Sequence, residues 1–88
     1  MTELDLKAIR ATIDELDTTL AQTLSKRLDT VLQVAAYKEA HQLPVLDAER
    51  EKQVLARMAA RVEQPEYRKP IANIMKEVMA ESRSLEVA

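Results

Sequence analysis

Residues 4–40 read LDLKAIRATIDELDTTLAQTLSKRLDTVLQVAAYKEA, a segment with neither Pro nor Gly. Its apolar side chains recur in steps of mostly three and four residues, at Leu6, Ile9, Ile13, Leu16, Leu20, Leu24, Leu28, Val31, Val34 and Ala35. At about 100° per residue, most of these side chains fall within an arc roughly 120° wide, which is typical of one helix face. We therefore expect one very long helix that begins near Thr2 to Asp5, with either residue as its N-cap, and ends near Ala40.

The length of this helix predicts a second chain. A helix of about 36 residues is roughly 54 Å long. A compact chain of this size has a radius of gyration of only about 12 Å. The helix is therefore longer than any core that one chain can build, and we expect a partner to cover the rest of its apolar face. A two-fold homodimer is the commonest solution.

Two Pro residues end helical segments and divide the chain into three. After Pro44, Asp47 is expected to cap a second helix from about Ala48 to Val62. Pro65 fits the first turn of a third helix, and Pro70 either bends that helix or delays its start. The buried faces of these two helices are expected to contain Val54, Leu55, Met58, Val62, Tyr67, Ile71, Ile74, Met75, Val78, Met79 and Leu85. The chain has no Gly and is rich in helix-forming residues, so residues 1–88 are expected to form one all-α domain.

Each expected helix carries polar side chains on its apolar face: Arg10, Arg27 and Lys38 on the first, Glu51 on the second, and Ser82 and Glu86 on the third. An unpaired buried charge costs several kcal/mol. For any one of these residues, a long side chain that reaches from the core edge to solvent is the ordinary interpretation. As a set, three cations with few anions favour a water-excluding pocket for a small, anionic, oxygen-rich ligand, because Arg offers a bidentate fork for carboxylates.

The spacing of the three cations restricts how they can cooperate. Arg27 and Lys38 are eleven residues apart. In a helix this spacing is close to three turns, so the two side chains point the same way within about 20° and are separated by roughly 16 Å. Arg10 and Arg27 are roughly 25 Å apart, too far to hold one small molecule from a single chain. Arg10 can therefore join the pocket only from a partner helix.

The composition disfavours several other classes of site. The formal net charge is −2 with both signs interspersed, which does not suggest a nucleic-acid partner. The chain has no Cys and a single His, His41, so neither a thiolate metal site nor a transition-metal cluster is expected. No apolar segment reaches membrane length and the N-terminus lacks a signal-peptide h-region, so a cytoplasmic protein is expected. His41 is expected to assist the end of the first helix, and Arg50 either supports Glu51 or lies near the ligand.

The residues above occur in a recognisable order: Ile9-Arg10, Ile13-Asp14-Glu15-Leu16-Asp17, Arg27, Tyr37-Lys38, Leu43-Pro44-Val45-Leu46-Asp47, Arg50-Glu51 and Met79-Ala80-Glu81-Ser82-Arg83. This combination resembles the type II, all-helical chorismate mutases over nearly the whole chain. The resemblance implies an intertwined homodimer with two active sites. It also implies an isomerase that converts chorismate to prephenate, by a Claisen rearrangement on the route to Phe and Tyr. This reaction needs neither a metal nor a cofactor, so none is expected.

The same resemblance implies roles for the polar residues. Arg27 and Arg10 of the partner subunit would bind the two carboxylates of the dianionic substrate. Lys38 would contact a carboxylate and the ether oxygen.

Three residues would complete the site according to the resemblance. Glu51 and the backbone at Asp47 would hold the ring hydroxyl, and Ser82 would help to close the pocket. Glu86 matches the residue that donates a hydrogen bond to the ether oxygen from the other side.

Glu86 differs from the Gln that is usual at this position. An ionised Glu cannot donate a hydrogen bond and repels negative charge that develops on the ether oxygen, whereas a protonated Glu can donate. We therefore expect activity to improve as the pH falls below neutral, and Glu86→Gln to be tolerated or beneficial near pH 7.

The residues leave other functions open. An isochorismate-pyruvate lyase shares this fold and a similar cationic pocket. A non-catalytic helical dimer that binds an anionic effector is a rival from another class. A coiled-coil scaffold is disfavoured, because Pro44 and Pro65 fold the chain back on itself. The sequence carries no signal for or against feedback control or a partner enzyme of the aromatic pathway.

Overall fold

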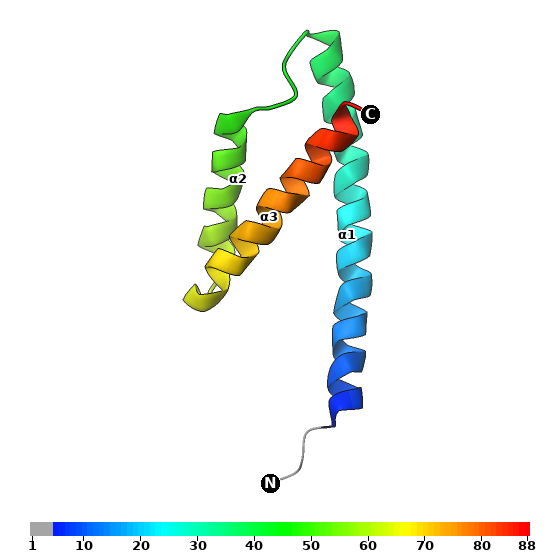
Figure 1. Ribbon diagram of the computed structural model, residues 1–88, viewed down its shortest axis with the longest axis vertical. Coiled ribbons are helices and arrows are strands. Elements are labelled where there is room, and N and C mark those ends of the chain that lie inside the picture. Colours follow the sequence, from blue (N-terminus) through cyan, green and yellow to red (C-terminus); the bar gives the residue numbers. More distant parts are fainter. Residues whose placement is uncertain (1–4) are drawn as a thin grey trace. The chain divides into compact units, whose positions relative to one another are not determined.

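The computed structural model describes residues 5–88, and within that range it contains three α-helices and no strand. They are α1 (Leu6–Ala40), α2 (Ala48–Arg61) and α3 (Pro65–Glu86), as Figure 1 shows. The predicted all-α class with three helices is therefore confirmed. The chain divides into two compact units, one ending at Thr30 and the other comprising Val31–Ala88.

The first unit contains the N-terminal part of α1, and Asp5 caps it. The Asp5 Oδ1 atom accepts a hydrogen bond from the Lys7 N–H at 3.0 Å, and the Asp5 carbonyl accepts one from the Ile9 N–H at 3.0 Å. These bonds satisfy backbone donors that have no partner inside the helix. Of the two caps that the sequence allows, Asp5 makes the contact, whereas Thr2 lies outside the described residues.

The first unit exposes apolar side chains. Five of them are between 40% and 63% exposed, namely Leu6, Ile9, Ile13, Leu16 and Leu20. They belong to the periodic set that the sequence predicts for one helix face. Contiguous apolar surface of this kind commonly marks an interface.

The second unit begins with the end of α1, which closes in a Schellman motif. The Leu43 N–H donates to the Lys38 carbonyl at 2.8 Å, and the Gln42 N–H donates to the Glu39 carbonyl at 3.3 Å. This pattern places one residue in the left-handed region, usually Gly. The chain has no Gly, and Gln42 takes this position with a φ of 55°. The motif turns the chain out of α1 and into the loop that leads to α2.

Helix α2 begins as the sequence predicts and ends one residue earlier. The Asp47 Oδ1 atom accepts a hydrogen bond from the Arg50 N–H at 3.0 Å, which confirms Asp47 as the N-cap. At the other end, Val62 is the C-cap, because its extended conformation already leads the chain toward α3. Helix α3 begins at Pro65 and continues through Pro70, so Pro70 does not delay its start. Pro70 removes one N–H near the beginning of the helix, where the loss is small.

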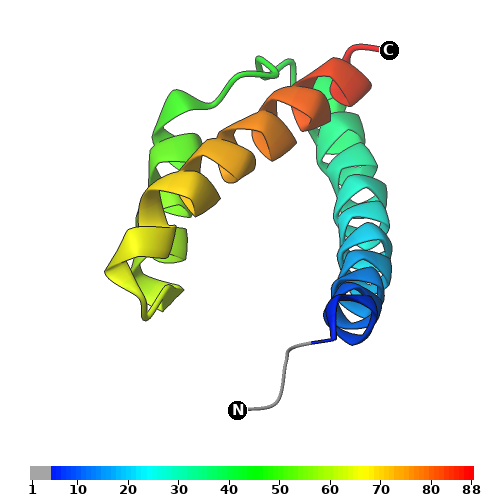
Figure 2. The same cartoon turned by 60° about the horizontal axis from the view of Figure 1, so that its bottom comes forward.

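Helices α2 and α3 follow each other after a short link and lie side by side, as Figures 1 and 2 both show. Met79 of α3 is the buried hydrophobic residue of the described chain. Half-buried apolar residues come from α2, its C-cap and α3: Val54, Leu55, Met58, Val62, Ile71, Met75, Val78 and Leu85. The prediction that Tyr67 and Ile74 are buried is wrong for this chain, since both are exposed. One neighbouring helix covers only part of the broad apolar face of α3.

Candidate functional site

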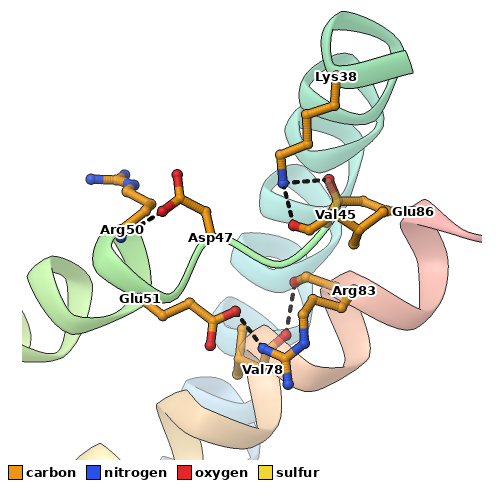
Figure 3. A network of polar contacts seen from close by, with 9 residues as sticks. Lys38, Val45, Asp47, Arg50, Glu51, Val78, Arg83 and Glu86 are labelled. Carbon is orange, nitrogen blue, oxygen red and sulfur yellow. Dashed lines mark hydrogen bonds and ion pairs between the residues drawn. The ribbon is translucent and has the colours of Figure 1, made fainter. Parts of the chain in front are cut away.

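Lys38 connects three elements of the second unit. Its Nζ donates hydrogen bonds to the Val45 carbonyl at 2.6 Å and to the Glu86 Oε1 atom at 3.1 Å (Figure 3). The contacts join the last turn of α1, the loop before α2 and the last residue of α3. The Lys38 side chain is 17% exposed and that of Glu86 is 5% exposed. A carboxylate so well buried requires an opposite charge nearby, and Lys38 provides it.

A pocket of about 390 Å³ adjoins this pair. It is lined by Leu32, Ala35, Ala36, Lys38, Glu39, Leu43, Val45 and Glu86. Small-molecule sites commonly combine mainly apolar walls with a few placed polar groups, and this volume suits a small ligand. The pocket belongs entirely to the second unit. Lys38 and Glu86 are therefore well placed to act on a molecule bound beside them.

A second charged contact joins the beginning of α2 to the end of α3 (Figure 3). The Arg83 Nη1 atom donates to the Glu51 Oε2 atom and forms an ion pair between the first turn of α2 and the last turn of α3. The side chains are 33% and 27% exposed, respectively. Glu51 was a predicted site residue, whereas Arg83 was not. The sequence position of Arg83 could have identified it. Arg83 follows Met79 by four residues and therefore lies at the edge of the buried face of α3.

Ser82 is buried, in agreement with its place on the apolar face of α3. Its Oγ atom donates to the Val78 carbonyl at 2.7 Å. Ser82 lies four residues before Glu86, so the two share a side of the helix. Its role in closing the pocket stays a prediction.

The remaining predicted residues lie in two places. Arg10 and Arg27 belong to the first unit, where Arg10 is exposed and Arg27 is half-buried. Asp47 belongs to the second unit, and its carboxylate caps α2. Arg50 is exposed, and it contacts Asp47 through its backbone N–H. This contact favours neither of the two roles predicted for the Arg50 side chain, which are to support Glu51 or to lie near the ligand. The second unit thus brings together Lys38 with Glu86 and Glu51 with Arg83.

His41 contacts the end of α1. Its Nδ1 atom lies 2.9 Å from the Tyr37 carbonyl, and its ring stacks on the Tyr37 ring with the centroids 4.0 Å apart. A carbonyl oxygen can only accept, so this contact requires a proton on Nδ1. Among the described residues, no group of three or more His, Cys, Asp or Glu side chains is arranged to hold a metal ion. Across the same residues, no helix combines the length and the hydrophobicity that a membrane span requires.

The chemistry of the Lys38–Glu86 pair suits an oxygen-rich anion. An ammonium group has three N–H donors, and here two of them reach Val45 and Glu86, which leaves one for a bound ligand. A carboxyl group accepts hydrogen bonds when it is ionised and also donates when it is protonated.

Residues 9–87 of the chain match the model of a protein family described as chorismate mutase type II.

Proposed function

The chain belongs to the type II chorismate mutase family, and we propose that it catalyses the Claisen rearrangement of chorismate to prephenate on the route to Phe and Tyr. The family match over residues 9–87 is the observation that carries this proposal. The paired Lys38 and Glu86 beside a pocket of about 390 Å³ support it. Such a pocket is suited to a compact molecule whose oxygen atoms need cationic and hydrogen-bonding partners.

The rearrangement is unimolecular: the ether C–O bond breaks while a C–C bond forms within one molecule. It requires neither a general base nor a nucleophile. The protein has to hold a compact conformer in which the reacting carbons are close. It also has to stabilise the negative charge that develops on the ether oxygen. The ammonium group of Lys38 serves this second purpose, and it also contacts a substrate carboxylate.

The other predicted residues bind the substrate. Arg27 and Arg10 of the partner subunit each pair with one carboxylate, for which the guanidinium fork is well suited. Glu51 accepts a hydrogen bond from the ring hydroxyl, together with the backbone at Asp47. Ser82 closes the pocket. The half-buried position of Arg27 and the ion pair of Glu51 with Arg83 at the beginning of α2 support these assignments.

The site needs a homodimer. Within the described residues, Met79 alone is a buried hydrophobic residue, whereas apolar side chains from Leu6 to Leu20 are exposed. A small chain with so little buried apolar surface gains stability by association. A second copy that covers this face of α1 also brings its own Arg10 toward a site on the other chain. Dimer formation and substrate binding are then one arrangement.

Glu86 is the second polar group that faces the reacting atoms in this mechanism. Its Oε1 atom lies at 3.1 Å from Lys38 and its side chain is almost fully buried, so its charge bears directly on the reacting oxygen atoms. The protonated form donates a hydrogen bond to the ether oxygen, whereas the ionised form opposes charge development there. Glu86→Gln, whose amide always carries donors, is therefore expected to be tolerated or beneficial near pH 7.

Product analysis tests the proposal. The purified chain is incubated separately with chorismate and with isochorismate, and the products are identified. Prephenate from chorismate is the expected result. Pyruvate release from isochorismate without prephenate formation would instead indicate a lyase. Thermal stabilisation by chorismate without turnover of either compound would indicate a non-catalytic binding protein.

A further inference from the structure

We propose that Arg83 is a positioning residue that fixes the Glu51 carboxylate for the hydroxyl group of the substrate ring. This inference rests on the proposed function, since it needs Glu51 to accept that hydroxyl. Arg83 itself touches Glu51 through an Nη1 to Oε2 hydrogen bond and acts through it. The geometry therefore adds a residue that the sequence analysis did not select.

The chemistry of the pair leaves Glu51 able to bind a ligand. Arg83 engages one carboxylate oxygen, Oε2. An ionised carboxylate has about four acceptor sites on its two oxygens, so it can accept a further bond from a hydroxyl group. Arg is charged at any pH at which the protein is folded, and its partner here is a carboxylate, which in its ionised form only accepts hydrogen bonds. A hydroxyl donor is thus favoured over an acceptor at this place.

The position of the pair suits this role. Glu51 lies in the first turn of α2, which Asp47 caps, and Arg83 lies in the last turn of α3. Glu86, the partner of Lys38, follows Arg83 by three residues on α3 (Figure 3). A Glu side chain has several rotatable bonds, so a backbone fixed by the cap does not fix its carboxylate. Arg83 holds the other end of the side chain and completes its orientation.

A purely structural ion pair between α2 and α3 is the alternative, and the chain offers a matched control for it. Arg68 is also on α3 and also reaches toward α2, with its Nε atom donating to the Val62 carbonyl at 3.1 Å. That contact lies at the opposite end of α3, near its first residue, Pro65. Partly exposed ion pairs contribute little to stability, so a structural role predicts similar, small effects for both arginines.

The test compares chorismate with an analogue that lacks the ring hydroxyl. We expect Arg83→Met to lower kcat/KM for chorismate by about 10- to 100-fold, because a poorly oriented acceptor loses the hydroxyl contact. For the analogue the loss is expected to stay within about threefold, since no hydroxyl is present. Arg83→Lys is expected to recover part of the loss, and Arg68→Met to change neither substrate's kcat/KM by more than about twofold.

A double mutant asks whether Arg83 acts through Glu51. In a Glu51→Gln background, Arg83→Met is expected to cause no further loss beyond about twofold, because residues that act as a unit are not additive. Thermal melts establish which variants are folded. If Arg83→Met does not fold, Arg83→Lys decides by the same comparison of the two substrates.

The outcomes separate the two proposals. Wild-type turnover of chorismate is measured first, and its absence overturns the proposed function together with the role of Arg83. If the wild type is active, equal losses for chorismate and the analogue overturn the role of Arg83 alone. An Arg83→Met effect no larger than that of Arg68→Met, or full additivity with Glu51→Gln, does the same.

Discussion

The two units of the chain satisfy their polar and apolar groups in different ways. In the first unit the hydroxyl groups bond inside their own helix: Thr12, Thr18, Thr19, Thr23 and Ser25 each donate to the carbonyl four residues earlier. In the second unit, polar side chains also bond between elements, as Lys38 does with Glu86 and Arg83 with Glu51. Both units leave apolar side chains exposed, but among the described residues only the second has a small buried centre, at Met79. The comparison indicates that contacts within the chain organise the second unit, whereas we propose that a second copy covers the exposed apolar face of the first.

The strongest challenge to this comparison is a charge on the exposed apolar face of α1. Ile13 is 49% exposed in the chain, so Ile13→Glu would be tolerated if the face stays in water. Because we propose that a second copy covers it, we expect loss of the dimer and a fall in chorismate mutase activity of about 100-fold or more. Light scattering after size exclusion measures the mass. Gln22→Glu is the matched control, since Gln22 lies on the opposite side of α1.

A second experiment separates the contributions of two chains. Arg10→Ala and Arg27→Ala dimers are each expected to be inactive. After joint unfolding and refolding, random pairing makes about half of the dimers mixed, with one intact site in two, so about a quarter of wild-type activity should return. Confirmed mixed dimers without activity would show that Arg10 does not act across the interface.

A third prediction tests the role of Glu86 in the second unit. An ionised Glu86 cannot donate a hydrogen bond to the ether oxygen, whereas the amide of a Gln can. Glu86→Gln is therefore expected to raise kcat/KM for chorismate near pH 7 by about tenfold. Steady-state kinetics of the two proteins at pH 7 provide the measurement. A large loss in Glu86→Gln would contradict the proposed role.

The smallest effect concerns the turn after α1. Gln42 has a φ of 55°, a conformation that is unfavourable for any residue with a Cβ atom. Gln42→Gly is expected to stabilise the protein by about 1 kcal/mol, less the greater chain entropy of Gly when unfolded. Gln42→Ala keeps the Cβ atom and should bring no such gain. Thermal melts at one fixed protein concentration compare the three proteins.

The fold was predicted from the spacing of the apolar residues and from the residues that begin and end helices. The three- and four-residue spacing predicted three helices, and the Asp residues at positions 5 and 47 act as caps, as their side-chain chemistry suggests. The end of α2 was placed one residue late, since Val62 is apolar whether it lies in the helix or caps it. Exposure of Tyr67 and Ile74 was missed because periodicity identifies an apolar face but not how much of it a neighbour covers.

The candidate site was predictable only in part. Polar residues on apolar faces singled out Lys38, Glu86, Glu51 and Ser82, which the structure places at the ends of α1, α2 and α3. The Arg83–Glu51 contact was missed, because α3 has to pack on α2 before the two residues become neighbours. The roles of Arg10 and Arg27 stay predictions, since they depend on a second chain.

The contact between Lys38 and the backbone of Val45 has a consequence for sequence divergence. Every amino acid supplies a carbonyl oxygen, so replacing Val45 leaves the acceptor in place. An insertion or deletion between Leu43 and Leu46 would instead move that oxygen away from the ammonium group. In a randomised library selected for function, this segment should therefore tolerate changes of identity at position 45 better than changes of length.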